Sequence, residues 1–260
     1  MKHLRLLKLF FRLGLLAQIE YRASFFLHVF EAGIMLLTGL SVLWVVFSQT
    51  DTIAGWSWNE LLVVMGLYFL GYGGVGLTLA PSIKEFMTDI WRGNLDFLLI
   101  KPESHQFLAS VRKVVFWSIV EITLGVVIVG VALVRLRTTI GFEQALLFVL
   151  ALATGAALIY SFWICLGVMA FWTTRLENIM LLYYHLYEAG RWPVAVYPGW
   201  LRYTLTFIVP VAFAITVPAE AIVGRLEWPM VAVGLLLAAA ALSGSRALFN
   251  FGLRRYTSAS

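Results

Sequence analysis

The chain has 260 residues, of which 61% are hydrophobic and 13% are charged, and its formal net charge at pH 7 is +5. Soluble domains are closer to half apolar and a quarter charged, so a mean hydropathy of +0.88 excludes a water-soluble globule. Several apolar runs reach the roughly 20 residues that a helix needs to cross a bilayer. They predict an all-α polytopic membrane protein. The excess of Lys and Arg then indicates contact with anionic membrane lipids, and no nucleic-acid binding is expected.

Motifs for catalysis and for tightly bound cofactors are absent from the sequence. The one cysteine, Cys165, cannot form a disulfide within the chain and has no Cys-His spacing of the metal-binding kind. No GxxxxGK[ST] phosphate loop occurs, nor any HExxH or GxSxG motif. We therefore expect no enzyme activity, no metal ion and no cofactor on this chain. If the chain moves a solute uphill, the energy has to arrive from another polypeptide.

Residues 1–23 are predicted to form a basic amphipathic helix that lies in the cytoplasmic interface of the membrane. On a helical wheel, the four basic residues from Lys2 to Arg12 share one stripe, and apolar residues such as Phe10 and Phe11 lie opposite. A mitochondrial presequence is the alternative for this pattern. No cleavable signal peptide is expected, because the first apolar run is too long for an h-region.

Residues 24–260 are expected to form one transmembrane domain. Apolar runs predict spans near residues 24–47, 61–80, 114–134, 145–172 and 229–249. The polar segment 81–113 is expected to be a loop between the second and third spans.

Residues 179–224 are harder to assign, because four prolines between residues 193 and 218 interrupt the apolar run. Two full spans fit, over residues 179–198 and 204–223. One span followed by a re-entrant helix pair, over residues 198–227, also fits. Six spans with both termini in the cytoplasm obey the positive-inside rule better. In that arrangement the Lys and Arg residues lie inside except for Arg135, Arg137, Arg191, Arg202 and Arg225.

The stretch DIWRGNLDFLLIKPESHQFLASVRK, residues 89–113, resembles the coupling segment of permeases from type-2 ABC exporters. The family pattern is a basic residue, Gly-x-Leu-acid-x-Leu-Leu and then a proline. The residues that match it here are Arg92, Gly93, Leu95, Asp96, Leu98, Leu99 and Pro102. The stretch YPGWLRYTLTFIVPVAFAITVPAEAIVGRL, residues 197–226, looks like the family's re-entrant region. YEAGRWPVAVYPGWLR and the tail RRYTSAS look like the viologen-exporter-type subfamily.

The resemblance implies half of an ATP-driven exporter in a prokaryotic cytoplasmic (inner) membrane. Two copies of an ABC ATPase, which carry the ATP and magnesium, would dock on the coupling helices. A second permease, a different chain or a second copy of this one, would complete the pathway. The implied substrate is amphiphilic or hydrophobic: a drug, a lipid or a natural product. Two departures are Asp96, where the family more often has Glu, and the pair His28 and Glu31 inside the first span.

The coupling segment also has a physical interpretation of its own. Leu95, Leu98 and Leu99 fall at i, i+3 and i+4, which gives a short helix one apolar face. Gly93 permits a turn before this helix, and Pro102 ends it. An exposed leucine ridge suits a groove on a partner protein. The alternative is an ordinary loop helix packed against the base of the bundle.

A second candidate site lies in YYHLYEAGRWP, residues 183–193. His185, Glu188 and Arg191 follow one another at i, i+3 steps, and ionisable groups at membrane depth usually face a cavity or a partner. With Tyr184 and Tyr187 they are candidates for the wall of an export pathway that takes an amphiphilic or cationic substrate. The alternative is a Glu188–Arg191 ion pair that holds the helix end near the outer interface.

Glu121, about two turns into the predicted third span, is a further candidate for lining the pathway. The alternative is pairing with basic neighbours near the cytoplasmic face. Two other functions stay open for the whole chain. One is an ion-driven secondary carrier that works through Glu188 or Glu121. The other is a membrane scaffold without a transport path.

Overall fold

The computed structural model describes Phe10 and residues 22–137, 140–173 and 177–256. In these residues the backbone is helical apart from short connections, and the only β-pairing is an isolated bridge between Ile53 and Trp56. Helices suit this apolar chain because they satisfy their own backbone hydrogen bonds, which lipid cannot do. The predicted amphipathic helix of residues 1–23 lies almost wholly outside the described residues.

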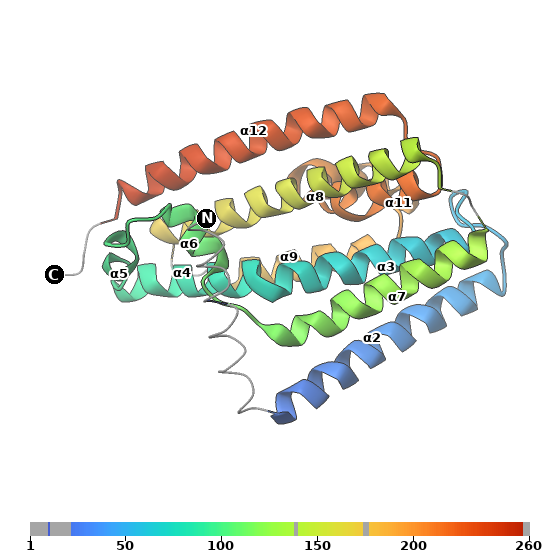
Figure 1. Ribbon diagram of the computed structural model, residues 1–260, viewed down its shortest axis with the longest axis horizontal. Helices are drawn as coiled ribbons and strands as arrows, with labels where there is room; N and C mark the ends of the chain where they lie inside the picture. Colours follow the sequence, from blue (N-terminus) through green and yellow to red (C-terminus); the bar gives the residue numbers. More distant parts are fainter. Residues whose placement is uncertain (1–9, 11–21, 138–139, 174–176, 257–260) are drawn as a thin grey trace.

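Five described helices are long and apolar enough to cross a membrane (Figure 1). They are α2 (Arg22–Phe47), the unit of α3 (Trp58–Gly74), η1 (Val75–Leu79) and α4 (Ala80–Arg92), then α7 (Ile119–Leu136), α8 (Phe142–Val168) and α12 (Trp228–Leu253). Four lie within a few residues of the spans predicted from hydropathy. The prediction of a polytopic membrane protein is confirmed.

The second span differs from the prediction because it does not end at residue 80. Helix continues to Arg92, so the apolar run and its polar extension form one unit of 35 residues. At 1.5 Å per residue this unit is about 52 Å long, whereas a bilayer with its headgroups measures about 40–45 Å. Pro81 lies within this unit without breaking it, because the π-helical turn η1 precedes it and the Leu77 carbonyl, to which Pro81 has no N–H to donate, accepts instead from the Val115 N–H at 2.8 Å. The first third of the expected loop 81–113 is thus helical.

Residues 177–222 contain helices that are each too short to cross a bilayer alone. α9 (Glu177–Glu188) and the following turn η4 (Ala189–Arg191) measure about 22 Å, less than the expected span over 179–198. Beyond the turn η5 (Val194–Val196), the helical segments Gly199–Ile208 and Ala212–Ile222 meet at a bend of 77° beside Pro210. By length and composition, the described residues therefore contain five candidate spans, or six if this bent pair is one broken span.

α3 lies at the centre of the bundle and packs most closely against α7 (Figure 1). Two glycines permit this approach. A Cβ atom built on Gly125 would lie 2.6 Å from the Gly66 carbonyl oxygen, and one built on Gly66 would lie 2.6 Å from a methyl of Val129. Small residues of this kind bring helix backbones together in lipid, where no hydrophobic effect drives association.

The end of the bundle opposite α5 (Asp96–Leu99) is closed by an arginine clasp. Arg225 Nη2 donates to Glu60 Oε1 at 2.5 Å and to the Gly55 carbonyl at 3.0 Å. Its guanidinium also lies 4.9 Å from the centre of the Trp56 ring. Because Glu60 caps the first turn of α3 through Ser57, the clasp joins the segment before α12 to the start of α3.

We expect Gly125→Ala to destabilise the bundle by about 1–3 kcal/mol, because the added methyl forces α3 and α7 apart. The midpoint of thermal unfolding in detergent, followed as the monodisperse fraction, measures this loss. Gly130→Ala on the same helix is the matched control, since its Cβ meets no atom within 4 Å. Equal midpoints for the two variants would contradict the packing argument.

Candidate functional site

The predicted coupling segment begins where α4 ends at Gly93. Gly93 has φ +71°, a left-handed conformation that favours glycine, and its N–H donates to the carbonyl of Ile90 at 3.2 Å. The N–H of Asn94 donates to the carbonyl of Asp89 at 2.9 Å, so the chain turns sharply back. The turn expected at Gly93 is confirmed. Arg92 and Pro102 are both exposed beside it.

The single turn of helix α5 presents a different face from the one predicted. Leu95 and Leu98 are 0% and 3% exposed and pack into the protein's own core, and Leu99 is half-buried against that core. The expectation of an exposed leucine ridge is wrong. The side chains that project outward are Phe97 and Ile100, at 71% and 78% exposure.

Sequence reasoning missed Phe97 and Ile100 because both faces of this helix are apolar. Their i, i+3 spacing was the available signal, but it competes with the equally regular leucines. Which of the two faces is buried depends on the surface of the bundle against which α5 packs. Asp96, between the two faces, is half-buried.

Three contacts hold α4, the helix that leads into this segment, on the bundle. Arg112 Nη1 lies 2.7 Å from Asp89 Oδ2, which joins α4 to the chain that follows α6 (His105–Val111). The Trp91 indole donates to the Thr173 carbonyl at 3.2 Å. The Phe86 ring stacks on Phe249 of α12 with centroids 5.4 Å apart. These contacts join α4 to Arg112, to Thr173 and to α12.

The π-helical turn η1 ties the same region to the start of α7. Its carbonyl at Leu77 accepts from the Val115 N–H at 2.8 Å. The buried Ser82 hydroxyl donates to the Lys113 carbonyl at 3.1 Å and accepts from the Lys113 N–H at 3.0 Å. These bonds fix the entry of the next span to the middle of the long helix.

The second candidate site divides into two faces of α9. His185 and Glu188 are exposed on one face, with His185 Nδ1 3.8 Å from Glu188 Oε2. Arg191 lies 4.0 Å from Glu188 Oε1 and 5.1 Å from the centre of the Tyr68 ring. The ion pair and the polar face expected from the sequence are thus both present.

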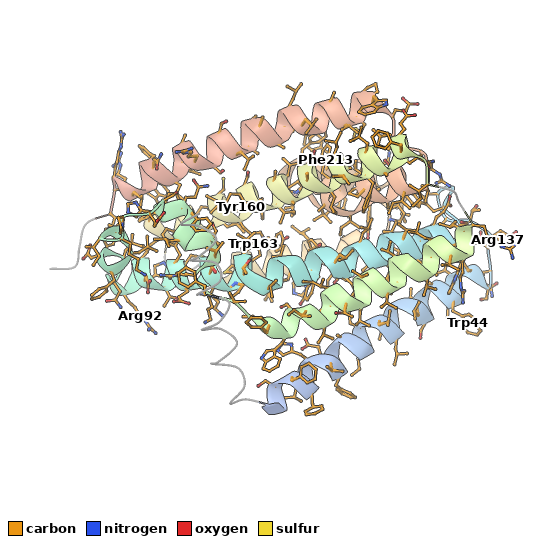
Figure 2. All side chains as sticks on the ribbon, viewed as in Figure 1. Trp44, Arg92, Arg137, Tyr160, Trp163 and Phe213 are labelled. Atoms are coloured by element: carbon orange, nitrogen blue, oxygen red, sulfur yellow. The ribbon has the colours of Figure 1, made fainter. Side chains whose placement is uncertain are left out.

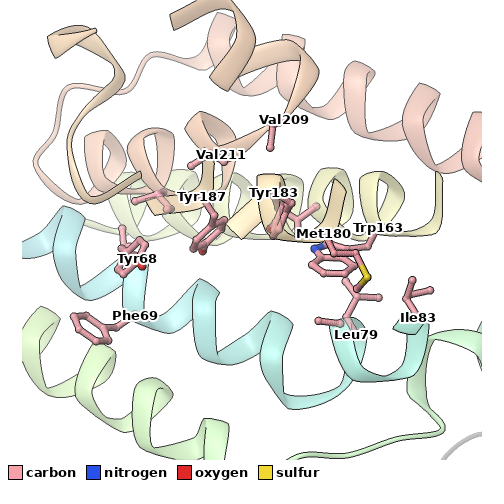
Figure 3. Close-up of a cluster of buried hydrophobic side chains, with 14 of the residues drawn as sticks. Tyr68, Phe69, Leu79, Ile83, Trp163, Met180, Tyr183, Tyr187, Val209 and Val211 are labelled. Carbon is pink, nitrogen blue, oxygen red and sulfur yellow. The ribbon is translucent and has the colours of Figure 1, made fainter. Parts of the chain in front are cut away.

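The tyrosines of α9 lie mainly on the opposite face. Tyr183 and Tyr187 are buried between α3 and α8, and Figure 3 shows them with Tyr68 and Trp163. Tyr187 lies 5.5 Å from Tyr68 and Tyr183 lies 4.8 Å from Trp163, centroid to centroid. We call these four rings the aromatic cluster. Tyr187 is thereby removed from the exposed wall on which it was predicted, and Tyr184 stays half-buried at its edge.

Gly71 is what lets the aromatic cluster close. A Cβ atom there would lie within 2.0 Å of the Tyr187 hydroxyl oxygen. The glycine-rich character of the second span thus serves contact with α9 as well as with α7.

Glu121 is separate from the α9 face. It is 7% exposed in the first turn of α7, where the positive end of the helix dipole favours a carboxylate. Among the described residues, no hydrogen bond or ion pair joins it to α9. In the part of the chain that the structure describes, no three His, Cys, Asp or Glu residues are grouped as metal ligands.

These helices and their long apolar spans define a multi-pass membrane protein. Residues 34–260 match the family described as ABC-2 family transporter protein, and the chain belongs to that family. It is accordingly an ABC permease subunit, the non-catalytic transport component, and membership implies association with an ABC ATPase. No curated protein and no solved structure matches the chain significantly.

We expect Leu98→Asp to lower the yield of folded protein, because it places a carboxylate in a buried position at a cost of several kcal/mol. Phe97→Asp, one residue away on the exposed face, leaves the yield unchanged. Size-exclusion profiles of the two variants in mild detergent measure the difference. A normal profile for Leu98→Asp would show that this leucine is not part of the core.

Proposed function

We propose that the chain is half of the transmembrane pathway of an ATP-driven exporter. The observation that carries this is the exposed pair Phe97 and Ile100, on a single turn of helix held rigidly at the end of a unit 35 residues long. Two large apolar side chains exposed beyond the membrane suit the groove of a partner protein. The partner that family membership implies is an ABC ATPase.

The distribution of charge indicates which end of the molecule faces the cytoplasm. Arg92 and Arg137 lie at opposite ends of the molecule (Figure 2). The end with α5 also carries Lys84, Lys101 and Arg112, together with the C-terminal residues Arg254 and Arg255. We place this end in the cytoplasm of a prokaryotic cell, with both termini inside, as the positive-inside rule requires.

The mechanism follows from the rigidity of the α3–η1–α4 unit. When the ATPases bind ATP and close, they push the Phe97–Ile100 pair. Because no loop interrupts the helix, α4 transmits this movement directly to α3. The aromatic cluster then carries it to α9, because Tyr68 of α3 packs on Tyr187. The exposed face of α9 with His185 and Glu188 lines the pathway, which a second permease completes.

The proposed subfamily and subunit composition rest on the resemblance of particular sequence stretches to viologen-exporter-type permeases. The viologen-exporter-type subfamily implies two ATPase copies and a second, different permease; a homodimer is the alternative. The polar edge of α9 beside exposed Leu181 and Leu182 suits a substrate that is itself amphiphilic or hydrophobic. Drugs, lipids and natural products all have this character.

We expect the double variant Phe97→Asp with Ile100→Asp to lose ATPase association by at least tenfold. Burial of each such side chain is worth about 1.5–3 kcal/mol. Co-purification of the tagged permease from its host, with partners quantified by mass spectrometry, measures the loss. Ile140→Asp with Phe142→Asp, an exposed apolar pair at the opposite end, is the matched control. Normal ATPase recovery with the first variant, correctly folded, refutes the docking assignment.

Glu188→Gln is expected to change stimulation of ATP turnover by an amphiphilic cation such as ethidium, without lowering protein yield. The reason is that Glu188 supplies the carboxylate of the exposed α9 face. Reconstituted complexes measure the effect, and Glu227→Gln at another exposed carboxylate is the control. A parallel loss of yield and stimulation would assign Glu188 to holding the helix end. Transport by the permease without ATP would favour the ion-driven carrier.

A further inference from the structure

A polar recess and an apolar crevice meet at Tyr160 on α8. The recess, about 470 Å³, lies between α6, α8 and α12 and is lined by Gln106, Tyr160, Ser243 and Arg246 among others. The crevice, about 430 Å³, runs between α8 and the α3–η1 unit, with Gly71, Gly74 and Ile159 in its wall. Tyr160 lines both, and Figure 2 shows it where α8 passes α6.

Helix α6 connects the two spaces as well. Gln106 lines the recess, and Ser110, one turn later, lines the crevice. The Ser110 hydroxyl lies 2.6 Å from the Gln106 carbonyl and 3.2 Å from the Tyr160 hydroxyl. The polar groups therefore gather at one end, and the wall becomes apolar towards the middle of the spans.

Arg246 is the only side chain of the two linings that is charged at neutral pH, and neither lining contains a carboxylate. Its guanidinium has no Asp or Glu oxygen within 4 Å among the residues that the structure describes. Arg246 lies seven residues before the end of α12, about 10 Å along the helix. A cation at that depth directs its head towards the lipid headgroups.

We infer that these two adjoining spaces together bind one anionic phospholipid of the surrounding bilayer. The phosphate accepts from the Arg246 guanidinium, with Ser243 and Gln106 beside it, and one acyl chain enters the crevice along Gly74 and Ile159. An anionic headgroup fits better than a zwitterionic one, because no carboxylate is present to hold an ammonium group. The inner leaflet, where we place this end of the molecule, is the leaflet that presents anionic lipid to basic residues.

This site is distinct from the proposed pathway. It lies between α3, α6, α8 and α12 and reaches α9 at the buried Tyr187, whereas the proposed pathway face is the opposite, exposed side of α9 with His185 and Glu188. Its occupation needs neither ATP nor the second permease. A test on the purified permease therefore separates the two proposals.

Native mass spectrometry of the full-length permease, titrated in detergent with phosphatidylglycerol or phosphatidylcholine, measures the headgroup preference. We expect wild type to favour phosphatidylglycerol by about tenfold, the effect of one charge-assisted contact. Arg246→Gln reduces that ratio to near one, and Arg254→Gln at the end of the same helix leaves it intact. Equal binding of both lipids by wild type, or an unchanged ratio in Arg246→Gln, overturns the inference.

A second variant tests the acyl chain. Gly74→Leu fills the crevice, where a Cβ atom meets no protein atom within 4 Å, and is expected to weaken both lipids at least fivefold. Gly130→Leu, equally open but outside the crevice, keeps wild-type affinity. Unchanged affinity in Gly74→Leu overturns the assignment of the crevice. Full displacement of the lipid by millimolar glycerol phosphate, which has no acyl chain, would show a simple anion site instead.

Discussion

The unbroken helix from Trp58 to Arg92 is the constraint on which the other elements depend. At about 52 Å it is longer than a bilayer is thick, and α4 at its end carries the charged residues Lys84, Glu85 and Asp89. Because it is also the central helix, each neighbour is placed by its contact with this unit. α7 approaches at Gly66, α9 approaches at Gly71, and the chain entering α7 bonds to the turn η1.

The aromatic cluster explains how the helices pack in one defined arrangement although the bundle has few buried charges. Apolar side chains gain little free energy by moving from lipid tails to a neighbouring helix. Close packing and polar contacts therefore determine which helices associate. Tyr68 brings α3 to Tyr187 of α9 and to Arg191 in the same contact. That arrangement fixes the rotation of α9, and with it the face on which His185 and Glu188 are exposed.

The sequence predicted the spans well because length and hydropathy alone select them, and α2, α7, α8 and α12 begin and end close to the expected residues. The sequence-based prediction failed where contacts between helices determine the local structure. Residues 81–92 are polar enough for a loop, yet they continue a helix that Phe86 anchors to α12. In α5 the pattern identified the segment and its turn at Gly93. It could not tell whether the leucines or the Phe97–Ile100 pair would face outward, because both sets are apolar at helical spacing.

The clasp at Arg225 has a consequence for how the molecule is made. Its two partners, Arg225 and Glu60, are 165 residues apart in the chain. At a synthesis rate of about 5–20 residues per second, Arg225 is added to the chain roughly 8–33 seconds after Glu60. During that interval α3 and α7 are both inserted and can already pack through their glycines. The clasp thus closes only after Arg225 has been synthesised, when α12 is the one long apolar helix of the described residues that still has to follow.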